Sequence, residues 1–300
     1  MVTLPEGVPP GAPPVRLRGR ELAGPVVMAV INRTPDSFFA AARYDDGGAR
    51  VAVARAADEG AAIVDLGGVR AGRGPEVTVA DEVARIAPLV AYVRSSHPDL
   101  LVSVDTWRAE VARAVADEGA DLLNDTWAGH DPGLVEVAAE RGLGVVCSHT
   151  GGVVPRTDPF RVTYGEDVDG VLDDVVATVS SAAARAVALG VDAASVLLDP
   201  THDFGKNTWQ SLHLLRRTQA LVALGHPVLM ALSRKDFVGE TLDLPVDERL
   251  EGTLAATAVA AWLGARVFRA HDVAATRRVL DLVASVRGER PPAGTVRGLA

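Results

Sequence analysis

The chain has 300 residues, of which 48% are hydrophobic and 23% are charged, and its formal net charge is −9. A chain of this length can bury most of its apolar surface in one core. The negative balance argues against a protein that binds a nucleic-acid backbone, because such proteins concentrate positive charge on one face. No run of about 18 apolar residues is present to span a membrane. Chemistry on a small molecule is therefore the better expectation.

The single cysteine and the two ends of the chain set the domain boundaries and the compartment. Cys147 allows no intramolecular disulfide, and it lies in an apolar run, so we expect a buried hydrophobe in a protein of the reducing cytoplasm. Residues 1–24 contain Pro and Gly clusters without a continuous apolar region, which predicts a flexible tail rather than a signal peptide. We expect one domain over residues 25–287 and a second tail over residues 288–300.

Short β-branched runs alternate with longer amphipathic stretches along the whole of this domain. The predicted strands cover residues 26–31, 62–66, 101–104, 121–123, 144–147, 195–198, 228–232 and 266–269. The predicted helices cover residues 48–60, 77–96, 108–119, 132–142, 167–190, 211–225, 246–264 and 272–287. Eight repeats of strand and helix favour an α/β fold with a parallel sheet closed into a single (β/α)8 TIM barrel. An open doubly wound sheet is the alternative, but no Gly-x-Gly-x-x-Gly turn follows the first strand.

Polar residues follow almost every predicted strand. They are Asn32, Asp65, Asp105, Asn124, His149, Asp199, Ser233 with Arg234 and Lys235, and Arg269 with His271. Because barrels of this kind build their active sites at the carboxyl ends of the strands, we expect these side chains to surround one pocket.

Cations gather after the last two strands. Arg269 can hold an anion through its two-pronged guanidinium, Lys235 offers a point charge and His271 a further donor, which favours a phosphate-type site. The alternative is that Arg234, Lys235 and Arg269 pair with acids on neighbouring helices.

Acids and amides follow the third, fourth and sixth strands. Asp105, Asn124 and Asp199 would be costly to bury without partners, and together they offer the acceptors and donors that read the edge of a flat heterocycle. The alternative is that each of them caps the helix that follows.

Several motifs in chain order resemble the dihydropteroate synthases. Residues 28–38 read MAVINRTPDSF, similar to the first signature of that family. The further matches are IVDLGG at residues 63–68, SVDT at 103–106, LND at 123–125, LDP at 198–200 with FGK at 204–206, SRK at 233–235 and RAHD at 269–272. The resemblance extends from about residue 26 to residue 286. Within the family the chain looks most like the divergent second paralogue of actinobacteria.

The resemblance implies a barrel that joins 4-aminobenzoate to a 7,8-dihydropterin pyrophosphate in folate synthesis, with Mg²⁺ and with release of pyrophosphate. It implies that the pterin is held by Asp105, Asn124, Asp199, Phe204 and Lys235. The diphosphate would be held by Asn32, Arg269 and His271, and the metal by Asn32. Thr34, Pro35 and Asp36 would belong to a mobile first loop, and the chain would form a homodimer.

The second loop departs from the family pattern. Where active synthases read GGESTRP, residues 67–75 read GGVRAGRGP, so the hydroxyl is lost and an arginine remains only out of register, as Arg70 or Arg73. The resemblance also places Gly-Phe-Gly where this chain has Thr201, His202 and Asp203, and a small hydroxyl residue at Asp236.

Further departures affect the pterin wall and the first loop. The methionine usual after His149 is absent, and residues 39–43 replace a Ser-Asp-Gly-Gly sequence. We therefore expect pterin and diphosphate contacts to persist while the site for 4-aminobenzoate is rewritten.

Three functions remain open from the sequence. The first is a synthase-type transferase that accepts another nucleophile, and the second is a non-catalytic pterin-binding or regulatory protein. The third is a methyl-transferring barrel that uses a folate and a corrinoid protein partner, although no feature of the sequence indicates such a partner.

Overall fold

Eight parallel strands form the centre of the molecule, in a computed structural model that describes residues 6–33, 45–157 and 162–297. They are β3 (Val26–Asn32), β4 (Ile63–Gly67), β5 (Leu101–Asp105), β6 (Leu122–Asp125), β7 (Gly144–Cys147), β8 (Val196–Leu198), β9 (Leu229–Met230) and β10 (Val267–Ala270). Their order is β8-β7-β6-β5-β4-β3-β10-β9, and a parallel bridge from Leu198 to Val228 joins the two ends. The predicted strands and the closed (β/α)8 barrel are confirmed.

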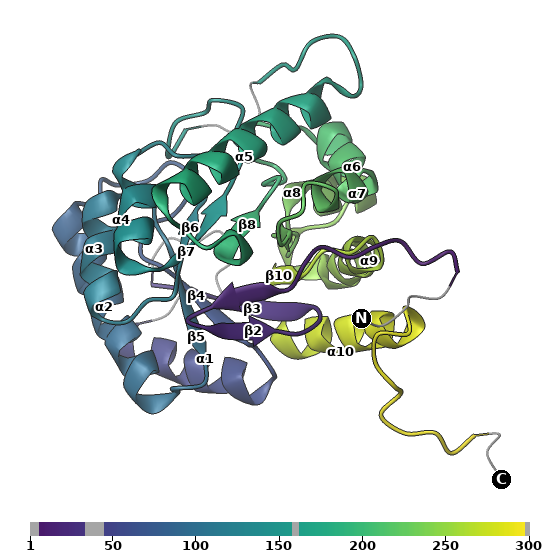
Figure 1. Ribbon diagram of the computed structural model, residues 1–300, viewed down its shortest axis with the longest axis horizontal. Helices are drawn as coiled ribbons and strands as arrows, with labels where there is room; N and C mark the ends of the chain where they lie inside the picture. Colours follow the sequence, from purple (N-terminus) through teal and green to yellow (C-terminus); the bar gives the residue numbers. More distant parts are fainter. Residues whose placement is uncertain (1–5, 34–44, 158–161, 298–300) are drawn as a thin grey trace.

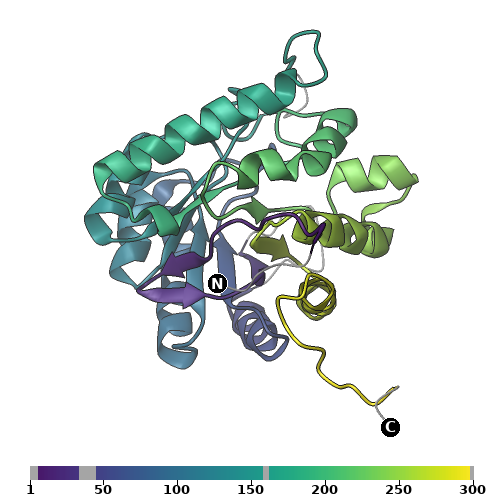
Figure 2. The same cartoon turned by 45° about the vertical axis from the view of Figure 1, so that its right-hand side comes forward.

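Helices surround this barrel on the outside (Figures 1 and 2). They are α1 (Asp46–Asp58), α2 (Val79–Ser96), α3 (Ala109–Asp117), α4 (Gly133–Arg141), α5 (Gly170–Leu189), α6 (Thr208–Arg216), α7 (Thr218–Val222), α8 (Asp236–Leu242), α9 (Leu250–Trp262) and α10 (Val273–Val286). The predicted helix over residues 211–225 is divided into α6 and α7, and the short α8 was not expected. None of the helices in the described ranges is long and apolar enough to cross a membrane.

The strands separate two apolar cores. Residues that point out of the barrel pack against the helices, as Val27 and Val64 do. Residues that point inward form a second core, and every strand contributes to it: Val26, Met28, Ile63, Leu101, Leu122, Val146, Leu197, Leu229 and Val267. This alternation is the two-residue period of a strand buried on both faces, so the barrel is filled rather than hollow.

Residues 9–22 are held against the base of the barrel, which corrects, for the described part of residues 1–24, the expectation of a flexible tail. The strands β1 (Val15–Leu17) and β2 (Arg20–Leu22) form an antiparallel hairpin, drawn in purple in Figures 1 and 2. Val15 and Leu17 belong to the inner core and are about 1% exposed. Leu17 lies so close to the first residue of β7 that a β-carbon on Gly144 would be 2.5 Å from it. The alternating apolar residues of the hairpin explain why this segment packs.

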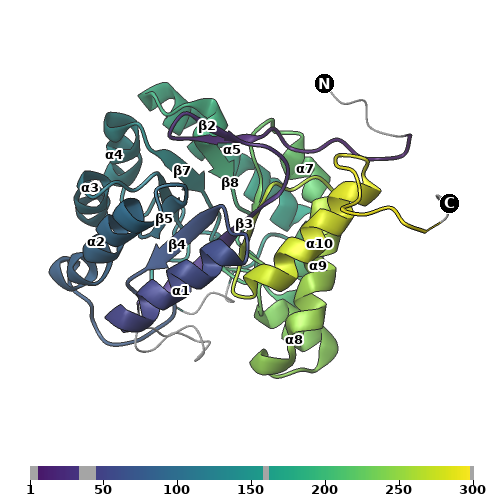
Figure 3. The ribbon, with the colours of Figure 1, turned by 90° about the horizontal axis from the view of Figure 1, so that it is seen from below.

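The residues before the hairpin are bound to the end of α10. Arg287, only 2% exposed, donates to the carbonyl of Pro9 at 2.9 Å and pairs with Glu289 at 3.0 Å. Arg266 donates to the carbonyl of Ala12 at 2.6 Å. Figure 3 shows the start of the described chain running beside α10. Because Glu289 takes part, the packed structure extends past residue 287, into the region expected as a second tail.

Candidate functional site

The carboxyl ends of β3 to β6 place the predicted polar residues in one row. Asn32 pairs in register with Gly67, Gly67 with Asp105, and Asp105 with Asn124. A glycine is needed in this row because a β-carbon on Gly67 would lie 3.0 Å from the Oδ1 atom of Asn32. Asn32, Asp105 and Asn124 are thus brought together at the mouth of the barrel, as the sequence predicted.

Asp65 is the centre of a buried network beneath this row. Its side chain is inaccessible to solvent, and its Oδ2 atom accepts from Arg269 Nε at 2.6 Å and from Asn124 Nδ2 at 3.1 Å. Its Oδ1 atom accepts from the Ser103 hydroxyl at 2.6 Å. The sequence places Asp65 among the strand ends but indicates no role for it. The signal was present, because a carboxylate inside an otherwise apolar strand requires partners.

Arg269 connects the network to the predicted pterin-reading residues. In addition to Asp65, it donates to Asp105 Oδ2 at 3.0 Å, while Thr126 donates to Asp105 Oδ1 at 3.0 Å. The sequence placed Arg269 with the diphosphate, but in this structure its guanidinium faces the acids of β4 and β5. Burial raises the pKa of Asp105 to about 7, against the lowering effect of Arg269. Burial and the nearby Asp65 thus oppose ionisation of this carboxyl group, while its ion pair with Arg269 favours it.

The three cations after the last strands have different partners. Arg234 forms a two-pronged ion pair with Asp272, at 3.0 and 3.1 Å, and donates to the carbonyls of Val246 and Asp247. The pairing alternative is thus correct for Arg234, which fixes the loop. Lys235 instead donates to the carbonyl of His202 and lies with its ammonium 4.7 Å from the centroid of the Phe204 ring. Lys235 and Phe204, both predicted to hold the pterin, therefore lie in contact.

His271 lies beside the end of β9. Its Nδ1 atom is 2.9 Å from the Ser233 hydroxyl, and its backbone N–H donates to the same oxygen. Burial lowers the pKa of His271 to about 3, and Arg269 lowers it further. The imidazole is neutral at pH 7, so it can offer one N–H but no full charge to an anion.

Asp199 does not cap the helix that follows, which was one of the two roles that the sequence left open. Its Oδ1 atom accepts the backbone N–H of Thr201 at 2.7 Å, which is a local turn rather than a helix cap. Burial raises its pKa, and Lys235 opposes the rise. Lys206, buried below it, donates to three backbone carbonyls, those of His149, Thr201 and Phe204.

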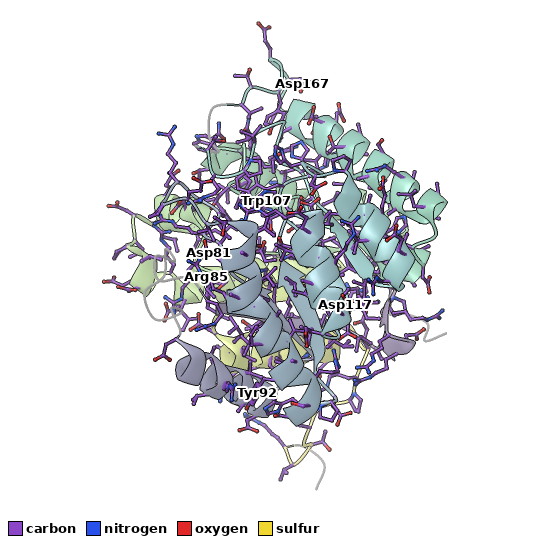
Figure 4. The ribbon with its side chains drawn as sticks, turned by 90° about the vertical axis from the view of Figure 1, so that its left-hand side faces the viewer. Asp81, Arg85, Tyr92, Trp107, Asp117 and Asp167 are labelled. Atoms are coloured by element: carbon purple, nitrogen blue, oxygen red, sulfur yellow. The ribbon has the colours of Figure 1, made fainter. Side chains whose placement is uncertain are left out.

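Aromatic side chains form a continuous row along the rim. Trp107 lies 6.5 Å from Trp127, and Trp127 lies 5.3 Å from Phe204, both measured between ring centroids and both edge-on. Figure 4 places Trp107 toward the end of the helix layer where Asp81 marks the start of α2, while Tyr92 lies at the opposite end. Because the ammonium of Lys235 lies over the Phe204 ring, these side chains extend along the mouth from the end of β5 to the end of β9. Two of the four tryptophans thus pack at this end of the barrel.

The two altered loops differ in what the structure describes. Thr34, Pro35, Asp36 and residues 39–43 lie outside the described residues. The loop over residues 67–75 is described, and Arg85 holds its start by donating to the carbonyl of Gly68 at 2.8 Å. Arg70 and Arg73 are exposed on this loop. No hydroxyl side chain is available from it.

The comparisons with known proteins agree with this barrel and this polar mouth. Residues 28–271 match the family model described as pterin binding enzyme, so the class is that of pterin-binding barrels. An inactive dihydropteroate synthase 2 of Mycobacterium leprae is 60% identical over 287 residues, covering 95% of this chain and 99% of the relative. The dihydropteroate synthase of Bacillus subtilis is 34% identical, covering 86% of this chain and 87% of the relative. The chain belongs to the dihydropteroate synthase family.

A solved structure agrees in fold. The Yersinia pestis dihydropteroate synthase, crystallised in a sulfonamide drug complex, superposes with a TM-score of 0.85 at 32% identity. The alignment covers 92% of this chain and all of that one. The resemblance noted from the motifs is thereby confirmed.

Proposed function

We propose that this protein binds a 7,8-dihydropterin pyrophosphate at the mouth of the barrel but does not condense it with 4-aminobenzoate. It is then a non-catalytic pterin-binding protein rather than a working transferase. The observation that carries the proposal is the contrast between two neighbouring strand ends. The network of Asp65, Asp105, Asn124 and Arg269 is complete, whereas the loop after β4 supplies no hydroxyl. The name of the Mycobacterium leprae relative supports the loss of activity.

The pterin edge would be read by the acids and amides of the mouth. Asp105 and Asn124 lie side by side in register, and Asp199 and Lys235 complete the set from the other side of the barrel. A carboxylate and an amide together satisfy the donors and acceptors of an aminopyrimidinone ring. A pterin that uses Asp105 competes with Arg269 for that carboxylate, so binding would release the guanidinium toward the diphosphate.

A magnesium ion fits the donors that are present. Within the described ranges no three His, Cys, Asp or Glu side chains are grouped to hold a metal. Mg²⁺ commonly keeps several waters and takes its other ligands from phosphate oxygens, so one amide oxygen from Asn32 is a sufficient protein contribution. His271 and Arg269 would then bind the diphosphate as in the family. A homodimer and a cytoplasmic location remain part of the same proposal.

Calorimetry with dihydropterin pyrophosphate and Mg²⁺ tests the binding. We expect saturable binding at one site and at least a tenfold loss of affinity in Asp105→Asn, which removes an acceptor charge from the mouth. Asp117→Asn is a matched control, because Asp117 pairs with Arg141 on the outer surface. No heat with any pterin would refute the proposal.

A turnover assay tests the absence of condensation. With 4-aminobenzoate added, we expect no dihydropteroate. Dihydropteroate formation at about 1 per second, the low end of ordinary enzyme turnover, would show that the chain is a working synthase.

A further inference from the structure

The loop that follows β8 has a backbone suited to glycine, yet it carries large polar residues. Thr201 and Asp203 have φ angles of 51° and 69°, in the left-handed region where a β-carbon is unfavourable. Residues held in this region strain the backbone. Such residues persist only where their side chains make contacts that compensate, so the contacts of Asp203 indicate its role.

The carboxylate of Asp203 lies at the start of α8 and accepts its first two backbone N–H groups. Its Oδ2 atom accepts the backbone N–H of Asp236 at 2.7 Å, and its Oδ1 atom accepts the N–H of Phe237 at 3.3 Å. The Ser211 hydroxyl donates to Oδ1 at 3.3 Å. The neighbouring positive charge is Lys235, which opposes the rise that burial causes in the pKa of Asp203. Three donors thus hold one carboxylate, and the charge of Lys235 acts on it from nearby.

A second observation in the same loop indicates that this region is shaped for more than packing. His202 is completely buried, and neither of its ring nitrogens has a hydrogen-bond partner among the described residues. Its ring lies 5.5 Å from the ring of Phe237, the residue whose N–H Asp203 holds. Unpaired polar atoms this deep are rare in native proteins and usually mark a water, an ion or a ligand.

We propose that Asp203 occupies the place of a ligand's carboxylate and so excludes acidic second substrates, among them 4-aminobenzoate. The position lies beside Phe204 and Lys235, which the proposed function assigns to the pterin, and to that extent the inference rests on it. A ligand seated there would have to displace Asp203 and present a second negative charge beside it. Asp236, the other new acid, does not act in this way, because its carboxylate pairs with Arg249 at 2.8 Å and is 76% exposed.

The test compares two single changes that each remove one negative charge. Asp203→Gly frees the N–H groups of Asp236 and Phe237 and relieves the positive φ, whereas Asp236→Asn leaves Asp203 in place. Each ¹⁵N-labelled protein is titrated with 4-aminobenzoate while the amide signals of residues 236 and 237 are followed. We expect saturable shifts of both signals in Asp203→Gly, at a concentration at least tenfold lower than in the unchanged protein. Asp236→Asn should behave as the unchanged protein does.

Three results would overturn the inference. The first is that the unchanged protein binds 4-aminobenzoate as tightly as Asp203→Gly does. The second is that Asp203→Gly and Asp236→Asn gain affinity equally. The third is that the amide signals stay unshifted in an Asp203→Gly protein that circular dichroism and thermal melting show to be folded. Pterin affinity measured on the same samples separates the two proposals. Retained pterin binding with unshifted amides refutes the role of Asp203 alone, whereas absent pterin binding in the unchanged protein refutes the proposed function.

Discussion

The two ends of the barrel show opposite uses of the same strands. At the base, the hairpin residues Val15 and Leu17 fill the space between the strand starts with apolar side chains. At the mouth, Asp65 and His202 are buried and the Arg269 side chain is 19% exposed, and such polar groups are costly in a dry interior unless they are paired. The difference is that apolar side chains fill the closed end, while ion pairs and hydrogen bonds around Asp65 occupy the polar end.

The largest effect is expected at the base, from Leu17→Ala. The side chain is 1% exposed and lies against the start of β7, so its removal leaves a cavity that the surrounding strands cannot fill. We expect the free energy of unfolding to fall by about 4 kcal/mol in a denaturant titration, with pterin affinity unchanged. Val51→Ala, at a 70% exposed position on α1, is the control and should change stability little. A loss below about 1 kcal/mol for Leu17→Ala would mean that the hairpin is not part of the core.

At the mouth, Asp65→Asn should lower the free energy of unfolding by less than Leu17→Ala does, but it should also weaken pterin binding. The change removes the charge that holds Arg269 at 2.6 Å, although Asp105 remains as a second partner. Removing one partner of a buried ion pair typically lowers the free energy of unfolding by about 3–5 kcal/mol. Because Asp105 still pairs with Arg269, we expect a smaller loss here, of about 2 kcal/mol. Pterin affinity should fall in the same variant, because an amide offers one acceptor oxygen where the carboxylate offers two, so it cannot hold Ser103, Asn124 and Arg269 as Asp65 does.

Asp117→Asn is the matched control for Asp65→Asn, since it removes a surface ion pair worth about 0.5 kcal/mol or less. Equal losses of unfolding free energy in the two variants would show that the network around Asp65 stabilises the fold no more than a surface ion pair does. The comparison between the two ends of the barrel would then lose its basis.

Much of the scaffold could be predicted because its signals are local. All eight strands are short apolar runs, and the position after each run fixes which side chains reach the mouth. Asn32, Asp105 and Asn124 therefore meet as the sequence indicates, because parallel strands in register bring equivalent positions together. The family resemblance added the chemistry of the ligand to this geometry.

Other features depend on contacts that no local pattern encodes. The hairpin looked like a tail because three-residue strands show too little alternation to identify. Asp65 emerged as the centre of the network only once Ser103, Asn124 and Arg269 were placed around it. For Asp203, the sequence showed an unusual residue, but only the structure shows that its carboxylate faces two backbone N–H groups.

The smallest predicted effect is the pH dependence of stability caused by His202, whose ring nitrogens have no hydrogen-bond partner among the described residues. Burial lowers the pKa of His202 well below its usual 6.5, and Lys235 and Lys206 lower it further, so at mildly acidic pH only the unfolded chain binds this proton. The protein therefore loses stability as pH falls below about 6.5, by about 1.4 kcal/mol per pH unit from this group. His202→Phe removes that loss. Its stability relative to the unchanged protein should rise by this amount between pH 6 and pH 5 in urea titrations.

The exposed His130 supplies the control for His202→Phe, because His130→Phe makes the same substitution on the surface and leaves the buried His202 ring in place. Parallel stability curves for His202→Phe and the unchanged protein would contradict the prediction. They would mean that a water or ion already pairs with the His202 ring and keeps its charged form accessible. A mouth that holds a water or an ion beside His202 would still differ from the base of the barrel, where the apolar core around Leu17 offers no polar partner.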